Sequence, residues 1–109
     1  MAETFKNAKI ISVGITATVL YTAPALTASV LHAVYLNNID GANSVSVTIE
    51  IFDSSDSGTV VIAKDILIPA GNDLVLEKQI NLETGDRIDI TASDASRLSA
   101  FASILEITA

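Results

Sequence analysis

The stretch FDSSDSGTVV, residues 52–61, gathers the acidic, hydroxyl and glycine residues that a calcium-binding loop uses. Four of its residues fall on the first, third, fifth and sixth positions of an EF-hand-like register: Asp53, Ser55, Ser57 and Gly58. The twelfth position, where a bidentate Glu would complete the site, is Lys64, whose positive charge repels calcium. The sequence therefore predicts a polar hairpin turn, in which Asp and Ser side chains bond nearby backbone amides, and no metal site.

The other residues that could carry chemistry lack visible partners. His32 is the only histidine, and general base catalysis would need a nucleophile and an orienting group near it. Asp86 and Asp89 are three positions apart, so on a strand they face opposite sides and form no carboxylate pair. No serine lies in a glycine-flanked elbow, and the five glycines are isolated. We therefore expect a protein that is not an enzyme, with no catalytic residue, no cofactor and no metal.

The composition points to an interface with another protein. The chain has 109 residues, which suits one compact domain. Half of its residues are hydrophobic and 17% are charged, whereas soluble domains average about 25% charged residues. A domain this poor in charge would expose much apolar surface if it stayed alone. We therefore expect it to associate with itself or with a partner protein.

The charge pattern argues against nucleic acid and membrane as partners. The net charge is −7, and the six basic residues are dispersed along the chain, whereas binding to phosphates needs clustered Lys and Arg. No apolar run has the length of a membrane span. The first residues include Glu3 and no continuous apolar core, so we expect no secretion signal and expect synthesis in the cytoplasm.

Alternating strands dominate the chain. In SVSVTIEIF, the residues Val45, Val47, Ile49 and Ile51 share one face, and DRIDITAS repeats the pattern. Lys64 and Lys78 interrupt apolar rows, which marks a bulge, a strand end or a protected edge. Turn residues separate the strands at short intervals. The sequence predicts an all-β fold, a single antiparallel β-sandwich or jelly roll of about eight short strands.

Two strands are apolar on both faces. In ASVLHAVYLNNI, one face carries Val30, Val34 and Leu36, while Leu31 and Tyr35 lie on the other. LSAFASILEI has a similar pattern. A strand that is apolar on both faces is covered on both, so we expect a subunit neighbour on one of them. The expected interface residues are Val30, Val34, Tyr35, Leu36 and Phe101, and a closed homotrimer is the first guess.

The order of these segments resembles a group of small virion-associated proteins of tailed bacteriophages. The segments that carry the resemblance are YTAP (residues 21–24), the long apolar strand 30–36, the turn Asp40-Gly41, PAG (69–71) and Gly85-Asp86. The resemblance implies a structural protein of the virion, such as a capsid decoration or cement subunit bound to the major capsid protein or another virion protein. Residues 9–109 would form the β-sandwich domain, and residues 1–8 an N-terminal arm that reaches a neighbour.

Two alternatives stay open. The protein could instead belong to the tail, the neck or the base of a fibre of the same particle. It could also be a carbohydrate- or receptor-binding module that uses polar loop residues as contacts: Asn37, Asn38, Asp40, Asn43, Asp53 and Asp56. A sugar-binding module needs an exposed aromatic platform, and the chain has no tryptophan and only two tyrosines, Tyr21 and Tyr35.

Overall fold

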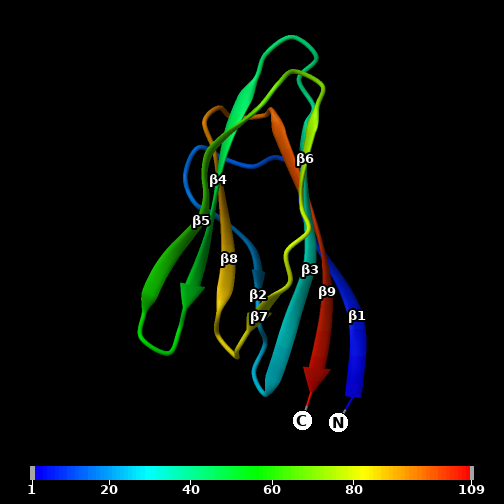
Figure 1. Ribbon diagram of the computed structural model, residues 1–109, viewed down its shortest axis with the longest axis vertical. Coiled ribbons are helices and arrows are strands. Elements are labelled where there is room, and N and C mark those ends of the chain that lie inside the picture. The colour runs from blue at the N-terminus through cyan, green and yellow to red at the C-terminus, as the bar shows by residue number, and fades with distance from the viewer. Residues whose placement is uncertain (1, 109) are drawn as a thin grey trace.

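The computed structural model describes residues 2–108, and all of their regular structure is β-strand (Figure 1). The strands are β1 (Ala2–Ile10), β2 (Thr18–Thr22), β3 (Thr27–Asn38), β4 (Val45–Asp53), β5 (Gly58–Ile68), β6 (Asp73–Leu76), β7 (Ile80–Leu82), β8 (Arg87–Ala92) and β9 (Leu98–Thr108). None of the described residues forms a helix that is long and apolar enough to cross a membrane. The predicted all-β class is confirmed.

The strands form two antiparallel sheets. The first sheet has the order β1-β9-β3-β6, with β7 also paired to β3, and the second has the order β2-β8-β4-β5. Because β6 pairs with residues 34–37 of β3 and β7 with residues 29–31, the two short strands act as one interrupted strand along β3. With β6 and β7 counted as one strand, each sheet has four strands in the order of a jelly roll, which confirms the predicted antiparallel sandwich.

The core lies between the sheets and follows the predicted alternation. In β4, Val45, Val47 and Ile49 are buried, and in β8 Ile88 and Ile90 are buried. Other apolar side chains of the core come from β2, β3, β5 and β9: Leu20, Leu31, Val34, Leu36, Ile68, Leu98, Ala100, Ala102 and Ile104. Each large aliphatic side chain that is buried stabilises the fold by roughly 1.5–3 kcal/mol. The inner faces of the two sheets therefore supply most of the folding free energy.

A bulge at His32 inverts the alternation of β3. The pairing of β3 with β9 runs to Leu31 and resumes at Ala33, so His32 is the inserted residue. Leu31 is buried before the bulge, and Val34 and Leu36 are buried after it. An inserted residue moves the following side chains to the opposite face of the strand. The inward-facing residues are therefore odd-numbered before the bulge and even-numbered after it, which explains part of the apolar pattern on both faces of this segment.

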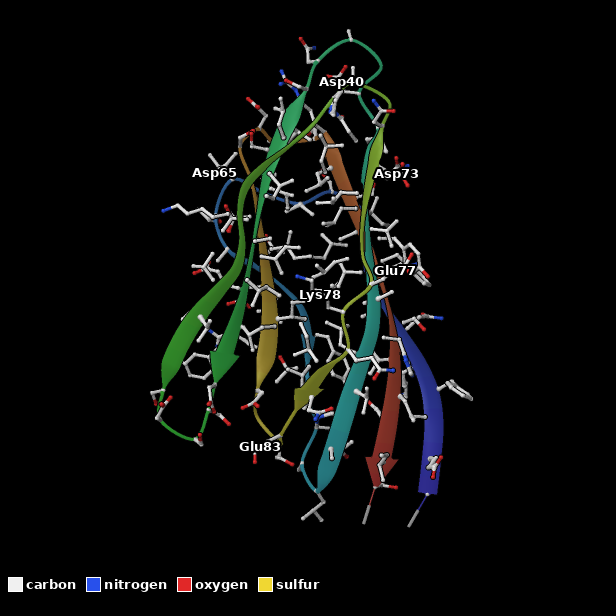
Figure 2. All side chains as sticks on the ribbon, viewed as in Figure 1. Asp40, Asp65, Asp73, Glu77, Lys78 and Glu83 are labelled. Atoms are coloured by element: carbon white, nitrogen blue, oxygen red, sulfur yellow. The ribbon has the colours of Figure 1, made fainter. Side chains whose placement is uncertain are left out.

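The two lysines that interrupt apolar rows lie where strands are interrupted, as predicted. Lys78 lies beside Glu77 on the segment that joins β6 to β7 (Figure 2). Lys64 lies in β5, an edge strand, between the β4-paired residues Ala63 and Ile66, where the register shifts. At both positions the backbone pairing of an edge strand is interrupted, so a strand from another molecule is less able to pair with that edge.

Residues 2–8, which the sequence sets apart as an arm, belong to β1. This strand pairs with β9 through nine consecutive residue pairs, from Ala2 opposite Thr108 to Ile10 opposite Ala100. It crosses the expected boundary at residue 8 without a break, and Met1 lies outside the described residues. That this segment also reaches a neighbouring subunit stays a prediction.

Candidate interaction surface

The surface of the first sheet that faces away from the core carries apolar side chains in cross-strand rows. Residues that pair directly across antiparallel strands share a face of the sheet. Two rows cross this surface, and we call their six residues the apolar outer face: Phe5, Leu105 and Val30 in one row, and Phe101, Tyr35 and Val75 in the other. The strands that carry them (β1, β9, β3 and β6) lie side by side in Figure 1.

The aromatic members of the apolar outer face are exposed to water to different degrees. Phe5 is 81% exposed, Tyr35 45% and Phe101 43%. Tyr35 and Phe101 are opposite each other, with ring centroids 6.4 Å apart and ring planes tilted by 49°. This is a favourable geometry for an aromatic pair. A partly exposed aromatic pair at the surface is the kind of feature that another protein covers on binding.

The structure divides the predicted interface residues between two environments. Val30, Tyr35 and Phe101 lie on the apolar outer face. Val34 and Leu36 are fully buried between the sheets and cannot touch a neighbour, which corrects their assignment to the interface. The physical reason is the bulge at His32, because it turns these two side chains into the core.

A depression of about 330 Å³ opens beside the aromatic pair. Tyr35 and Phe101 line it together with Lys9, Asn37 and Ser99. It therefore combines two ring faces, one cation and neutral polar groups. Such a combination can hold a small polar ligand or a sugar ring as well as a protein side chain.

A polar cluster joins the two sheets at one end of the sandwich. The hydroxyl of Tyr21 on β2 donates a hydrogen bond to Glu106 on β9 and lies 2.7 Å from the hydroxyl of Ser29 on β3. Burial, followed by the hydrogen bond to Glu106, raises the pKa of Tyr21 to about 12. A phenol held in its protonated form is a hydrogen-bond donor and a poor base. The cluster therefore links the two sheets through a phenol that stays protonated at neutral pH.

The carboxylate of Asp86 connects the β4–β5 turn to the turn that precedes β8 through hydrogen bonds. Its Oδ1 accepts hydrogen bonds from the backbone N–H and the hydroxyl of Ser54, both at 2.9 Å. Its Oδ2 accepts the backbone N–H of Glu83 at 2.9 Å. Burial on its own would raise the pKa of Asp86, but the hydrogen bonds from Ser54 and Glu83 lower it. Asp86 is therefore held as a carboxylate by the two turns that it connects.

The structure brings together three carboxylates that sequence reasoning left apart. Oxygens of Asp53, Glu83 and Asp86 lie within 4.8 Å of one another. No local signal could have revealed this cluster, because Asp53 ends β4 and the other two lie in the turn before β8. Both oxygens of Asp86 already accept hydrogen bonds, and Oδ1 of Asp53 accepts the backbone N–H and the hydroxyl of Ser55.

The stretch FDSSDSGTVV forms the predicted hairpin turn between β4 and β5. Asp53 accepts the backbone N–H of Ser55 at 3.0 Å, and Asp56 accepts that of Gly58 at 2.9 Å. The acidic side chains therefore bond local backbone amides, as predicted for such a turn.

Several polar residues that sequence reasoning offered as ligand contacts form hydrogen bonds within the protein instead. Asn38 is 1% exposed, and its side-chain amide donates to the carbonyls of Ile68 and Pro69. Asp40, which Figure 2 places in the loop between β3 and β4, accepts the backbone N–H of Ala42 at 2.8 Å. His32 lies on the bulge, half-buried. Of the polar residues offered as ligand contacts, only Asn37, which lies in β3, lines the depression beside the aromatic pair.

The fold is similar to that of several solved structures. A chain of infectious bursal disease virus, Gx strain, matches with a TM-score of 0.60 and 15% identity over 99% of this chain and 34% of that chain. The VP2 subviral particle of the same virus matches with a TM-score of 0.58 and 15% identity over 95% of this chain and 32% of that chain. Bacillus endospore appendages, described as pili, match with a TM-score of 0.52 and 18% identity over 99% of this chain and 91% of that chain.

The likeness to the viral chains concerns one part of them, because this chain spans about a third of their length. No protein-family model matches the sequence, and no curated protein sequence matches it. At these low identities the likeness shows the fold alone: the chain shares its β-sandwich fold with part of the infectious bursal disease virus chains and with the endospore appendage chain.

Proposed function

We propose that this protein is a non-catalytic structural subunit of a virus particle, and that it binds copies of itself or another virion protein through the apolar outer face. The observation that carries this proposal is the aromatic pair of Tyr35 and Phe101, which is nearly half exposed on the outer surface of the first sheet. The fold supports it, because part of the VP2 chain in a subviral particle of infectious bursal disease virus has a similar fold. The low fraction of charged residues supports it as well.

Within the particle, we propose that the protein decorates the head of a tailed bacteriophage as a cement subunit on the major capsid protein. A subunit that touches several neighbours at once gains avidity, so it would bind the assembled shell more tightly than free capsid protein. A trimer would present three copies of the apolar outer face to such a lattice. The net charge of −7 would keep the outer surface of the particle soluble.

Two charge substitutions, Tyr35→Glu and Phe101→Glu, test whether the protein binds its partners through the apolar outer face. Truncating a central interface aromatic commonly costs about 2 kcal/mol, which corresponds to roughly thirtyfold weaker binding. Each variant should therefore lose oligomerisation or shell binding by at least that factor while its thermal unfolding stays cooperative. The matched control is Leu67→Glu, at a residue that is 62% exposed on the second sheet, and it should bind like the wild type.

The place in the particle is tested by mass spectrometry of purified particles with a copy-number estimate. Hundreds of copies would support a decoration subunit, whereas a handful would favour the tail, the neck or a fibre base. Absence of the protein from purified particles would overturn the proposed virion role.

The depression beside the aromatic pair favours a second candidate, a carbohydrate- or receptor-binding module. Here Tyr35 and Phe101 would stack on a sugar ring, and Lys9, Asn37 and Ser99 would provide polar contacts. A glycan array tests this function directly. Binding that disappears in Phe101→Ala would support it, and the absence of any bound glycan at high protein concentration would remove it.

A further inference from the structure

We propose that the free edge of β1 pairs with the β1 strand of a second copy, antiparallel and about a two-fold axis perpendicular to the first sheet. This inference goes beyond the proposed function and does not depend on it, because it rests on the edge of the sheet and not on the apolar outer face. The two first sheets would then join into one sheet of eight main strands. The observation that carries the inference is the contrast between β1 and the other sheet edges.

The other edges of the two sheets are short or irregular. The edge of the first sheet opposite β1 is made of β6 and β7, which have four and three residues and are separated by a segment that carries Glu77 and Lys78 (Figure 2). In the second sheet, β2 has five residues and a register shift between Val19 and Tyr21. The other edge, β5, is long, but its register against β4 shifts twice, and Asp65 there has a φ of 51°. Such features prevent a further strand from pairing.

The edge formed by β1 has none of these irregularities along its length. Its nine residues pair with β9 without a register shift, and every side chain from residue 2 to residue 7 is exposed. Figure 1 shows β1 on the outside of its sheet, with β9 on its inner side. Every second residue of an edge strand points its backbone N–H and C=O toward the free side, so a long row of these groups is available for pairing.

The charges along β1 favour one register with a second copy. If Lys6 lies on the two-fold axis, Glu3 of each copy is opposite Lys9 of the other, so two oppositely charged pairs form on the outer face. Thr4 is then opposite Ala8, and Phe5 is opposite Asn7. Lys6 faces Lys6 of the second copy on the other face, which offsets part of this gain. A shift by a single residue would set outward side chains opposite inward ones.

This register also covers the most exposed aromatic side chain of the protein. Phe5, which is 81% exposed, becomes the diagonal neighbour of Phe5 of the second copy, within reach of an aromatic contact. The two apolar outer faces then lie side by side on one continuous surface. Pairing of the β1 edges would therefore double the surface that a further partner can cover.

Disulfide cross-linking tests the two-fold register, because the natural chain contains no cysteine. Lys6→Cys should form an intermolecular disulfide under mild oxidation, since residues directly opposite across antiparallel strands have Cβ atoms about 5 Å apart. The matched controls are Thr4→Cys in the same strand and Lys78→Cys on the opposite edge. Thr4 would lie about 13 Å from Thr4 of the second copy, too far for a disulfide, so both controls should stay monomeric on a denaturing gel.

Charge reversal tests the same contact without a covalent bond. Glu3→Lys and Lys9→Glu should each raise the dissociation constant of the dimer by about tenfold, because each replaces two favourable pairs by two repulsive ones. The double variant Glu3→Lys/Lys9→Glu restores opposite charges and should return the constant to within about twofold of the wild-type value. Glu77→Lys changes the net charge by the same amount as Glu3→Lys but lies at the opposite edge, so it should leave the dissociation constant unchanged.

Two results would overturn the proposal. One is a wild-type chain that sediments as a monomer at several hundred micromolar and shows no added hydrogen-exchange protection of the β1 amides on concentration. The other is a dimer in which Phe5→Cys or Asn7→Cys cross-links and Lys6→Cys does not, because that pattern requires a different register. Since particle composition and variants of Tyr35 are measured separately, a failure here is distinguishable from a failure of the proposed function.

Discussion

Tyr21 and Glu106, which are 85 positions apart in the sequence, are hydrogen-bonded across the gap between the two sheets. Glu106 is 8% exposed, and the Tyr21 hydroxyl also contacts Ser29. The carboxyl group thus lies at the end of the core, where its hydrogen-bond donor comes from the opposite sheet. The contact ties β2 of the second sheet to β3 and β9 of the first, so it belongs to the tertiary structure and not to any one strand.

Removing the hydroxyl of Tyr21 should destabilise the fold. In Tyr21→Phe the largely buried Glu106 loses a donor, and leaving a buried polar group without its partner costs about 1–3 kcal/mol. The free energy of unfolding in urea measures this loss. Tyr35→Phe is the matched control, and it should change stability by less than about 0.5 kcal/mol because it is a surface change. Equal effects of the two variants would contradict the structural role of Tyr21.

The raised pKa of Tyr21 predicts a loss of stability at alkaline pH. The phenol titrates near 10.0 in an unfolded chain and at about 12 in the folded protein. Because the folded pKa is the higher one, this contribution is complete below pH 10 and is lost as the pH rises toward 12. Urea midpoints measured across this range should fall more steeply for the wild type than for Tyr21→Phe. Parallel curves would show that Tyr21 does not carry the effect.

Asp86→Asn should loosen the connection between the β4–β5 turn and the turn before β8. The new amide nitrogen would replace an acceptor and face the backbone N–H of Glu83 or Ser54, so at least one hydrogen bond is lost at a cost of about 1–3 kcal/mol. Because the folded pKa of Asp86 is lowered, its contribution is present above the ordinary pKa of 3.8 and fades as the pH falls below it. Asp56→Asn, at an exposed position, should cost less than about 0.5 kcal/mol.

Calcium should leave the folding stability unchanged. A ligand stabilises a protein only when it binds the folded state preferentially, and the carboxylates near the FDSSDSGTVV turn already accept hydrogen bonds from local donors. The measurement is the melting temperature with and without millimolar calcium. A rise of several degrees that disappears in Asp53→Asn would make the cluster of Asp53, Glu83 and Asp86 a metal site and would refute this prediction.

Gly85 should tolerate substitution less well than Gly58. Gly85 has a φ of +89°, and an added Cβ would lie 3.0 Å from the hydroxyl oxygen of Ser54. We expect Gly85→Ala to cost at least about 1–2 kcal/mol. In the hairpin turn the positive φ falls on Ser57, and a Cβ at Gly58 would meet the flexible carboxylate of Asp56. Thermal unfolding of both alanine variants checks this order, and a larger loss for Gly58→Ala would contradict it.

The parts of the fold that depend on local periodicity could be predicted from the sequence. Val47 and Ile49 in β4, and Ile88 and Ile90 in β8, alternate with polar residues and are buried as expected. Strand geometry sends successive side chains to opposite faces, so the pattern itself reveals the inward face. The turn at residues 53–58 was predictable for a similar reason, because Asp and Ser bond amides two residues away.

The features that local patterns could not predict depend on pairing between strands that are distant in the sequence. One sequence shows that Val34 and Leu36 share a face, but the partner strand β9 determines that His32 is the inserted residue and that this face is the core. The contact between Tyr21 and Glu106, and the approach of Asp53 to Asp86, join segments whose distance along the chain exceeds the reach of any local pattern. Local alternation specifies most of the strands, and composition specifies the low fraction of charged residues, but neither revealed that residues 2–8 belong to β1. The folded sheets decided which apolar side chains became core and which, like Tyr35 and Phe101, stayed at the surface, because register is set by pairing between distant strands.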